Sequence, residues 1–223
     1  IIEQLRREYG IDFSLYKLDM IQRRIERRLL IADRNDVDAY AEQLAGDEGE
    51  LSALYRDLLV GVTDFFRDQE AYAALERQLP RMIDRLDVDE ELRVWVPATA
   101  TGEEAYSIAI LICEAFAAKE LPVRCRIFAT DVHQASLDFA SQGLYPETRL
   151  RGVNLKRRHR YFRKEAGGFR VSPEIRQFVV FATHNVISDA PFTKLHLISC
   201  RNLFIYLKPE VQCRVLTLFH FGL

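Results

Sequence analysis

The chain has 223 residues, of which 48% are hydrophobic and 29% charged, and its formal net charge at pH 7 is −2. This balance argues against a chain-wide nucleic-acid-binding or membrane-binding surface, and no apolar run is long enough to span a bilayer. The four cysteines lack C-x-x-C spacing, which argues against a zinc site and a disulfide framework. We therefore expect a cytoplasmic protein without a bound metal, without a nucleic-acid partner and without direct membrane insertion.

The first part of the chain, up to about Leu86, carries helical patterns only. In the segment 16–31, apolar side chains recur at helical spacing, and arginines occupy the remaining faces. The apolar positions are Leu18, Ile21, Ile25 and Leu29. Further helices are predicted over 36–45, 47–60 and 67–86, the last one restarting or kinking at Pro80. Asp47 and Glu50 indicate an N-terminal capping arrangement.

From Leu92 onward, short β-rich runs alternate with helical patterns, which predicts a doubly wound, mostly parallel sheet. The predicted strands lie at 92–96, 124–131, 178–186 and 195–202, and the predicted helices at 103–119, 134–141 and 209–219. The segment 160–172 breaks this alternation. It predicts a hairpin that turns at Gly167–Gly168, within a small β insertion at about 160–177 between the second and third strands of the sheet.

Small and polar residues follow each predicted strand, where ligands of open parallel sheets bind. Glu103 and Glu104 begin the first helix, would repel a phosphate and would suit a ligand with a positive charge. Asp131 can accept hydrogen bonds from the hydroxyls of a ribose, and the amide of Asn185 suits an adenine edge. This pattern indicates a nucleoside with a cationic tail, such as S-adenosylmethionine. A dinucleotide dehydrogenase is less well supported because the G-x-G-x-x-G motif is absent.

Each of these polar residues also has an ordinary structural explanation. Glu103 could complement the helix dipole, Asp131 could cap the following helix, and Asn185 could close a turn. For any one of them this explanation is favoured. Their occurrence together at successive strand ends favours a binding site.

Several uncommon motifs occur in order along the chain, and together they resemble the chemotaxis receptor methyltransferase family (CheR). They are "YK…RRIERR", "DLLVGVTDFFRD", "RVWVPATATGEEAYSIAI", "FATDV", "GLYP", "FATHNV" and "ISCRNLFIYL". The chain is most similar to members that are fused to a methylesterase and often to a sensor kinase. The resemblance implies a protein-glutamate O-methyltransferase that uses S-adenosylmethionine, yields S-adenosylhomocysteine and acts on cytoplasmic helices of chemoreceptors.

The resemblance also implies a domain organisation. Residues 1–62 form a helical receptor-docking domain, 63–91 a linker and helix, and 92–223 a methyltransferase domain. The family continues beyond "FHFGL" with a Gly-rich turn and a closing hairpin, so we expect the C-terminal strands of the sheet to be missing. The short insertion "RKEAGGFRV" implies independence from a receptor tether peptide.

Residue roles carried over from the family form three groups. Arg67 and Tyr206 are the expected catalytic residues, holding the substrate carboxylate and standing near the transferred methyl group. The expected cofactor-binding residues are Gly61, Thr63, Arg67, Ala98, Glu103, Glu104, Asp131, Asn185, Val186, Arg201 and Asn202. The expected receptor-docking residues are Lys17, Arg23, Arg24, Arg27 and Arg28, although the same helix face could simply be solvated and ion-paired.

Ala98 and Thr99 stand where many members of the family have glycine and cysteine. Alanine at position 98 costs little if its φ angle is negative, and a positive φ would strain it. We favour retained cofactor binding. The alternative is a non-catalytic module that binds receptor or S-adenosylmethionine as a sensor or scaffold.

Overall fold

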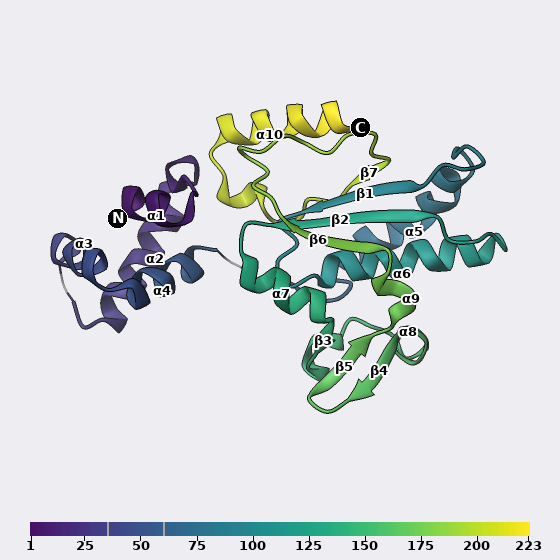
Figure 1. Cartoon of the computed structure of the whole chain (residues 1–223), viewed down its shortest axis with the longest axis horizontal. Coiled ribbons are helices and arrows are strands. Elements are labelled where there is room, and N and C mark those ends of the chain that lie inside the picture. Colours follow the sequence, from purple (N-terminus) through teal and green to yellow (C-terminus); the bar gives the residue numbers. More distant parts are fainter. Residues whose placement is uncertain (35, 60) are drawn as a thin grey trace. The chain divides into compact units, whose positions relative to one another are not determined.

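The computed structural model describes residues 1–34, 36–59 and 61–223. The chain divides into two compact units (Figure 1). The helical unit comprises residues 1–60 with 202–214, and the sheet unit comprises residues 61–201 with 215–223.

The helical unit contains the helices predicted for the first part of the chain. They are α1 (Ile2–Tyr9), α2 (Leu18–Ile31), α3 (Val37–Gly46) and α4 (Glu48–Leu58), with the 3-10 turn Phe13–Leu15 between α1 and α2. Val60, at the end of the predicted fourth helix, lies outside the described residues. Of the apolar positions at helical spacing in α2, Ile21 and Leu29 are buried, whereas Leu18 is 57% exposed.

Capping and an ion pair define how α4 joins the other helices. Oδ1 of Asp47 accepts a hydrogen bond from the backbone N–H of Glu50 (2.9 Å), as the capping pattern predicts. The Glu50 side chain does not return to the helix end. Its Oε1 accepts hydrogen bonds from Nε of Arg28 (2.9 Å) and from the hydroxyl of Tyr40 (2.6 Å), which ties α2 and α3 to α4.

The segment 202–214, which the sequence assigns to the methyltransferase domain, packs with the N-terminal helices. It contains the 3-10 turn Phe204–Tyr206 and the start of α10 (Pro209–Gly222). The backbone N–H of Lys17 donates to the carbonyl of Tyr206 (2.8 Å), and that of Lys208 donates to the carbonyl of Leu15 (3.1 Å). The start of α2 is therefore held by a segment far away in sequence.

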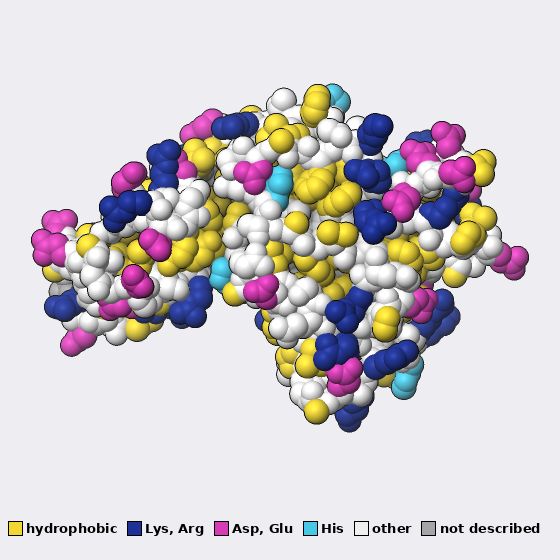
Figure 2. Space-filling model, in the orientation of Figure 1, with side chains coloured by type: hydrophobic (Ala, Val, Ile, Leu, Met, Phe, Trp, Pro, Cys, Tyr) yellow, Lys and Arg dark blue, Asp and Glu magenta, His cyan; other side chains and the backbone are white. Residues whose placement is uncertain are grey.

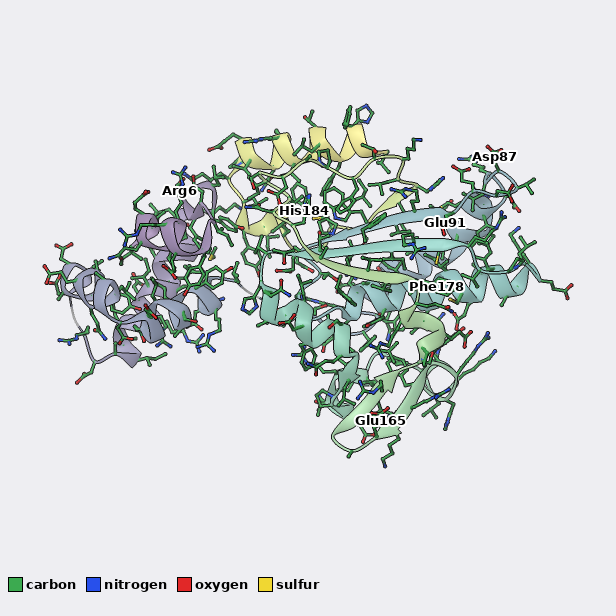
Figure 3. All side chains as sticks on the ribbon, in the orientation of Figure 1. Arg6, Asp87, Glu91, Glu165, Phe178 and His184 are labelled. Atoms are coloured by element: carbon green, nitrogen blue, oxygen red, sulfur yellow. The ribbon has the colours of Figure 1, made fainter. Side chains whose placement is uncertain are left out.

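The sheet unit is built on four parallel strands in the order β6-β2-β1-β7. The strands are β1 (Leu92–Pro97), β2 (Cys125–Asp131), β6 (Val179–Thr183) and β7 (Leu197–Ile198). This order and direction confirm the predicted doubly wound sheet. Figure 3 shows Glu91 and Phe178, which precede β1 and β6, toward one end of the sheet and His184, which follows β6, toward the other. The carboxyl ends of the strands therefore share one edge.

Helices pack on both faces of the sheet and bury β1 on both sides. Val94 and Val96 belong to the core shared with α5 (Gln69–Ile83) and α6 (Glu103–Ala118). Trp95 points to the other face, where its ring meets Phe219 of α10 at 5.3 Å between centroids. A strand buried on both faces reads as a continuous apolar run, as "RVWVP" does.

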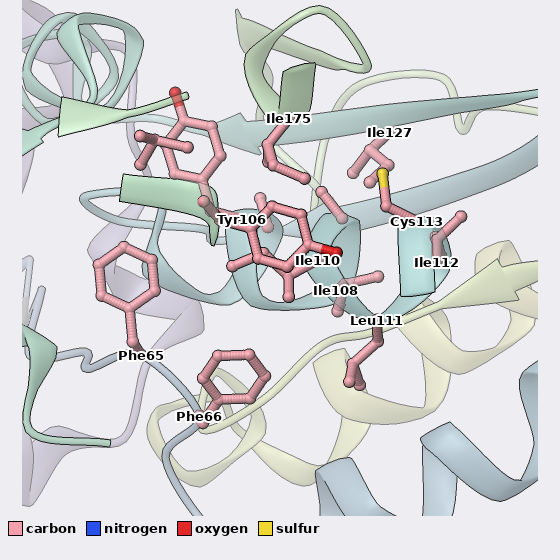
Figure 4. Close-up of a cluster of buried hydrophobic side chains, with 14 of the residues drawn as sticks. Phe65, Phe66, Tyr106, Ile108, Ile110, Leu111, Ile112, Cys113, Ile127 and Ile175 are labelled. Atoms are coloured by element: carbon pink, nitrogen blue, oxygen red, sulfur yellow. The ribbon is translucent and has the colours of Figure 1, made fainter. Parts of the chain in front are cut away.

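The core of the sheet unit surrounds α6, whose side chains are buried from Glu103 to Cys113 (Figure 4). A helix that is apolar on all faces belongs inside a protein. Phe65 and Phe66 from the segment that precedes α5 join this cluster, together with Ile127 of β2. The two phenylalanines anchor the 61–68 segment to the sheet unit.

The β insertion forms a separate antiparallel sheet in the order β3-β5-β4. Its elements are β3 (Leu144–Tyr145), η2 (Glu147–Leu150), α8 (Leu155–Tyr161), β4 (Phe162–Glu165), β5 (Gly168–Val171) and α9 (Pro173–Arg176). The turn lies at Ala166–Gly167, one residue earlier than predicted, because Gly168 already pairs with Glu165. A Cβ atom at Gly168 would lie 2.2 Å from the Tyr145 carbonyl oxygen, which explains this glycine. Lysine and arginine side chains gather over this insertion in Figure 2.

Candidate functional site

The loop between β1 and α6 crosses the carboxyl end of β2. The backbone N–H of Thr99 donates to the carbonyl of Thr130 (3.0 Å), and that of Ala100 donates to Oδ2 of Asp131 (2.8 Å). Ala98 has a φ of 53° and Ala100 a φ of 50°, both in the left-handed region. An unstrained alanine at position 98 requires a negative φ angle, so Ala98 is strained. A left-handed conformation costs a non-glycine residue about 1–2 kcal/mol.

Asp131, at the end of β2, is held by backbone donors. Its Oδ1 accepts a hydrogen bond from the N–H of His133 (3.0 Å) and its Oδ2 from Ala100. Burial raises the pKa of Asp131, and these donors oppose the shift because they favour the carboxylate. Each carboxylate oxygen retains a further lone pair, so two hydroxyl groups of a ligand can still bind here. The capping explanation and the binding explanation are compatible.

Glu103 is fully buried at the start of α6. Its Oε2 accepts a hydrogen bond from the Thr101 hydroxyl (2.6 Å), whereas its buried Oε1 has no hydrogen-bond partner within the described part of the chain. Nη1 of Arg149 lies 3.4 Å from that Oε1. Burial raises the pKa of Glu103, and Thr101 and Arg149 counteract the shift.

Glu104, the next residue, faces a second group of partners. Its Oε1 accepts a hydrogen bond from the Ser199 hydroxyl (2.6 Å), directly after β7. Burial raises its pKa to about 7, and Ser199 and the cations Arg201 and Arg67 limit the rise. Near neutral pH this carboxyl group can therefore gain or lose its charge.

Arg201 fastens the 61–68 segment to the end of β7. Its Nη1 donates to the carbonyl of Arg67 (2.6 Å), its Nη2 pairs with Asp68, and its guanidinium lies 5.1 Å from the Tyr72 ring centroid. The Arg67 side chain is exposed and donates from Nη1 to the carbonyl of Val62 (2.9 Å). Arg67 thus stays at the surface beside Glu104, with donors available for a substrate.

Thr63 and Gly61 lie on the same segment as Arg67. The Thr63 carbonyl accepts a hydrogen bond from Nη1 of Arg149 (2.6 Å), while Gly61 is exposed. Eight expected site residues therefore lie in the sheet unit along the edge formed by the carboxyl ends of β1, β2 and β7 or on the segment fastened to it. They are Gly61, Thr63, Arg67, Ala98, Glu103, Glu104, Asp131 and Arg201.

Asn185 and Val186 follow β6, which pairs with β2 up to Asp131. Oδ1 of Asn185 accepts a hydrogen bond from the N–H of Ile187 (3.0 Å), and the Asn185 N–H donates to Asp189 (2.8 Å). The turn-closing explanation for Asn185 therefore applies. Val186 is buried beside it.

The remaining expected site residues belong to the helical unit. Asn202 and Tyr206 lie in its 202–214 segment. In α2, Arg23 and Arg27 are exposed, Arg24 is half-buried, and Lys17 precedes the helix at an exposed position. Arg28 differs from them because its side chain is only 14% exposed and is committed to Glu50. This contact gives Arg28 a structural role, and its expected docking role stays a prediction.

Both units match models of known protein families. The family model "CheR methyltransferase, SAM binding domain" matches residues 61–223, and "CheR methyltransferase, all-alpha domain" matches residues 1–59. The chain belongs to the CheR methyltransferase family. This confirms the family expected from the motifs.

Three CheR relatives indicate the range of the similarity. The chain is 40% identical over its whole length to "Uncharacterized 104.1 kDa protein in hypE 3'region" of Rhodobacter capsulatus, of which it spans 23%. It is 34% identical over 96% of its length to "Chemotaxis protein methyltransferase 2" of Pseudomonas aeruginosa, of which it spans 77%. It is 30% identical over 94% of its length to "Chemotaxis protein methyltransferase" of Escherichia coli, of which it spans 73%. The expected fusion to a methylesterase stays a prediction.

Sequence reasoning missed two residues that contact this candidate site, Arg149 and Ser199. Ser199 lies within the quoted motif "ISCRNLFIYL", so its place after β7 could have singled it out. Arg149 carries no such signal, because it is one of 31 lysines and arginines and lies 86 residues from Thr63.

Between residues 1 and 223, leaving out 35 and 60, no group of three or more His, Cys, Asp or Glu side chains could hold a metal ion. Within the same residues, no helix is long and apolar enough to cross a membrane.

Proposed function

We propose that the chain binds S-adenosylmethionine and transfers its methyl group to glutamate side chains of a chemoreceptor. The observation that carries this proposal is the gathering of Asp131, Glu103, Glu104 and the Arg67 segment at one sheet edge. It is supported by a CheR match that covers both units of the chain. The names of the Pseudomonas and Escherichia relatives support a chemotaxis role.

The residues present fit S-adenosylmethionine. Two carboxyl groups at the start of α6 are buried, and among the described residues Oε1 of Glu103 has no hydrogen-bond donor, only the Arg149 cation at 3.4 Å. Such carboxylates suit a ligand with a positively charged ammonium group, because an unpaired buried charge is unfavourable. Asp131 would hold the ribose hydroxyls, and the Asn185–Val186 turn would flank the adenine. When bound, the cofactor supplies an electrophilic methyl group on sulfur.

The residues of the chain would then act mainly by positioning. A glutamate carboxylate has an ordinary pKa near ~4.3, so it is already nucleophilic at neutral pH and needs no strong general base. Alignment of the reacting atoms supplies most of the acceleration. In this proposal Arg67 holds the substrate carboxylate and Tyr206 orients it.

Receptor docking is assigned to the exposed basic positions of the helical unit. Lys17, Arg23, Arg24 and Arg27 are the more accessible members of the predicted set, whereas Arg28 is already paired with Glu50. Arg27 also lies 3.8 Å from Asp57, a pair whose arginine is 58% exposed and therefore easily exchanged for an acidic partner. These side chains would face acidic segments of the receptor.

Calorimetry with S-adenosylhomocysteine tests the cofactor site. We expect the 223-residue chain to bind it and Asp131→Asn to weaken binding by about tenfold or more, because charge-assisted hydrogen bonds to a ligand contribute about 1.5–3 kcal/mol. Asp138→Asn, on the exposed face of α7 (Gln134–Gln142), is the matched control and should bind like the wild type. Absence of binding by the wild type would contradict the proposed methyltransferase function.

Transfer of labelled methyl groups to receptor cytoplasmic domains separates catalysis from binding. We expect Arg67→Ala to lose at least about tenfold in transfer rate at saturating S-adenosylmethionine, a loss beyond any change in its affinity for S-adenosylhomocysteine, since positioning terms of this size are common. The positive φ angles of Ala98 and Ala100 favour the second candidate, a non-catalytic binding module. Binding without transfer by the wild type would establish that second function.

A further inference from the structure

The 147–152 turn packs directly against the backbone of the 61–68 segment. Arg149 in this turn donates to the Thr63 carbonyl (2.6 Å). Three residues later, a Cβ atom at Gly152 would lie 2.1 Å from the Phe65 carbonyl oxygen. Only glycine permits this approach. The carbonyl groups of Thr63 and Phe65 therefore both contact the 147–152 turn.

The same guanidinium also faces the start of α6. Nη1 of Arg149 lies 3.4 Å from Oε1 of Glu103, the buried oxygen without a hydrogen-bond partner. The other groups facing Glu103 are the Thr101 hydroxyl, the Asp64 carboxylate and the Tyr145 ring, and Arg149 is the nearest cation. One arginine therefore links the linker backbone to the carboxylate that begins the cofactor-facing helix.

The 61–68 segment needs such support because its backbone is strained. Phe66 and Asp68 have φ angles of 52° and 60°, in a region that L-residues seldom occupy. Strained conformations persist only when their surroundings hold them. Arg201 holds the Arg67 carbonyl at one end, Ser107 holds the Phe66 N–H (3.0 Å), and Arg149 holds the Thr63 carbonyl at the other end.

We propose that Arg149 is a positioning residue for methyl transfer: it holds the Thr63 carbonyl and the buried Glu103 carboxylate together, and so sets the Arg67 segment in register with the cofactor loop. This assignment rests on the proposed function. Arg149 acts through Thr63 and Glu103 and touches no reacting atom.

Substitutions at Arg149 separate this role from general stability. Arg149→Met keeps the apolar stem and removes the contacts with Thr63 and Glu103, together with the 4.0 Å ion pair between Nη1 and Oδ1 of Asp64. Arg149→Lys keeps one cation that can serve these oxygens. Arg126→Met is the matched control, because Arg126 forms an exposed ion pair with Glu91 (3.6 Å) near the amino end of β2. Gly152→Ala tests the same segment by a different change, because its Cβ atom would displace the Phe65 carbonyl while Arg149 is intact.

Two measurements decide the proposal. Calorimetry with S-adenosylhomocysteine should show at least about tenfold weaker binding by Arg149→Met, with the loss greater at pH 6 than at pH 8, because burial without the cation favours protonated Glu103. Arg149→Lys should recover most of the affinity, and Arg126→Met should match the wild type. Combining Arg149→Met with Glu103→Gln should lose no more than the worse single variant, as expected for coupled residues.

Hydrogen exchange of the ligand-free protein gives an independent result. Amides of residues 61–68 should exchange faster in Arg149→Met and Gly152→Ala than in the wild type, with the central strands unchanged. Unchanged exchange in these amides, or wild-type affinity in Arg149→Met, would overturn the proposal. If the wild type binds no S-adenosylhomocysteine, the proposed function fails, and the exchange experiment alone reports whether Arg149 positions the segment.

Discussion

The Glu104 carboxyl group is buried, accepts a hydrogen bond from the Ser199 hydroxyl and lies near the cations Arg201 and Arg67. Its pKa of about 7 lies above its ordinary value of 4.5, mainly because of burial. The folded, ligand-free protein therefore holds the proton that the unfolded chain releases. Stability due to this group is present below the unfolded pKa and is lost as pH rises from about 4.5 to about 7.

Glu104→Gln should consequently have opposite effects on stability and on binding. Above pH 7 the free energy of unfolding of the ligand-free variant should exceed that of the wild type by up to about 3 kcal/mol. One pKa unit corresponds to about 1.4 kcal/mol. Its affinity for S-adenosylhomocysteine should fall by about tenfold or more. Denaturant titrations at pH 5 and pH 8 and calorimetry measure the two effects, with the exposed Glu70→Gln as control. A stability change that is equal at both pH values would contradict the assignment.

Ala98 is strained by its φ of 53°. Ala98→Gly should raise the free energy of unfolding by about 0.5–1 kcal/mol, because relief of about 1–2 kcal/mol of strain is partly offset by the greater freedom of glycine in the unfolded chain. Ala109→Gly, in the middle of the buried helix α6, should instead lower it by about 1 kcal/mol or more. Thermal unfolding of both variants without ligand tests the contrast, and a loss of stability in Ala98→Gly would show that the alanine is not strained.

At the scale of elements, the buried contact of Arg28 with Glu50 joins α2 to α4, and Tyr40 of α3 completes it. The Arg28 hydrogen bond is the main reason that the pKa of Glu50 is lowered. Stability from this pair is therefore present above the unfolded pKa of Glu50 and is lost as pH falls through the lowered value.

Arg28→Met should lower the free energy of unfolding by about 3 kcal/mol at pH 7, because it leaves a largely buried carboxylate without its cation. Arg23→Met, at an exposed position where Nε bonds only the Asp19 carbonyl in α2, should change it by less than about 0.5 kcal/mol. The difference between the variants should shrink at acid pH. Chemical denaturation between pH 4 and pH 7 provides the measurement, and equal effects of both substitutions would contradict a structural role for Arg28.

The elements themselves follow from local patterns, and their partners do not. Helical spacing located α2, and alternation of strands with helices predicted the parallel sheet, because both depend on neighbours within a few residues. Helical spacing does not show which apolar positions are buried: Leu18 is 57% exposed, since the width of the buried face is set by what packs against it. The hairpin turn was displaced by one residue because the position of Gly168 depends on the distant Tyr145 carbonyl.

At the scale of the whole molecule, the candidate site depends on contacts between distant residues. Motif order identified the family and the strand-end residues Glu103, Asp131 and Arg201. The pairing of Arg149 with Thr63 could not be predicted, because 86 residues separate them and no periodicity relates them. Nor did the sequence indicate that the segment 202–214 packs with the N-terminal helices. Both depend on the complete fold.

The chain contains one tryptophan, and the fold places it beside the candidate site. Trp95 is buried in β1, and its indole Nε1 donates to the hydroxyl of Thr130 (2.9 Å), the residue before Asp131. Its ring also meets the ring of His184 edge-on, at 5.3 Å between centroids. Excitation at wavelengths that the nine tyrosines do not absorb therefore yields fluorescence from one indole, which contacts the end of β2 and the end of β6, so ligand binding at the candidate site can be followed optically without any added label.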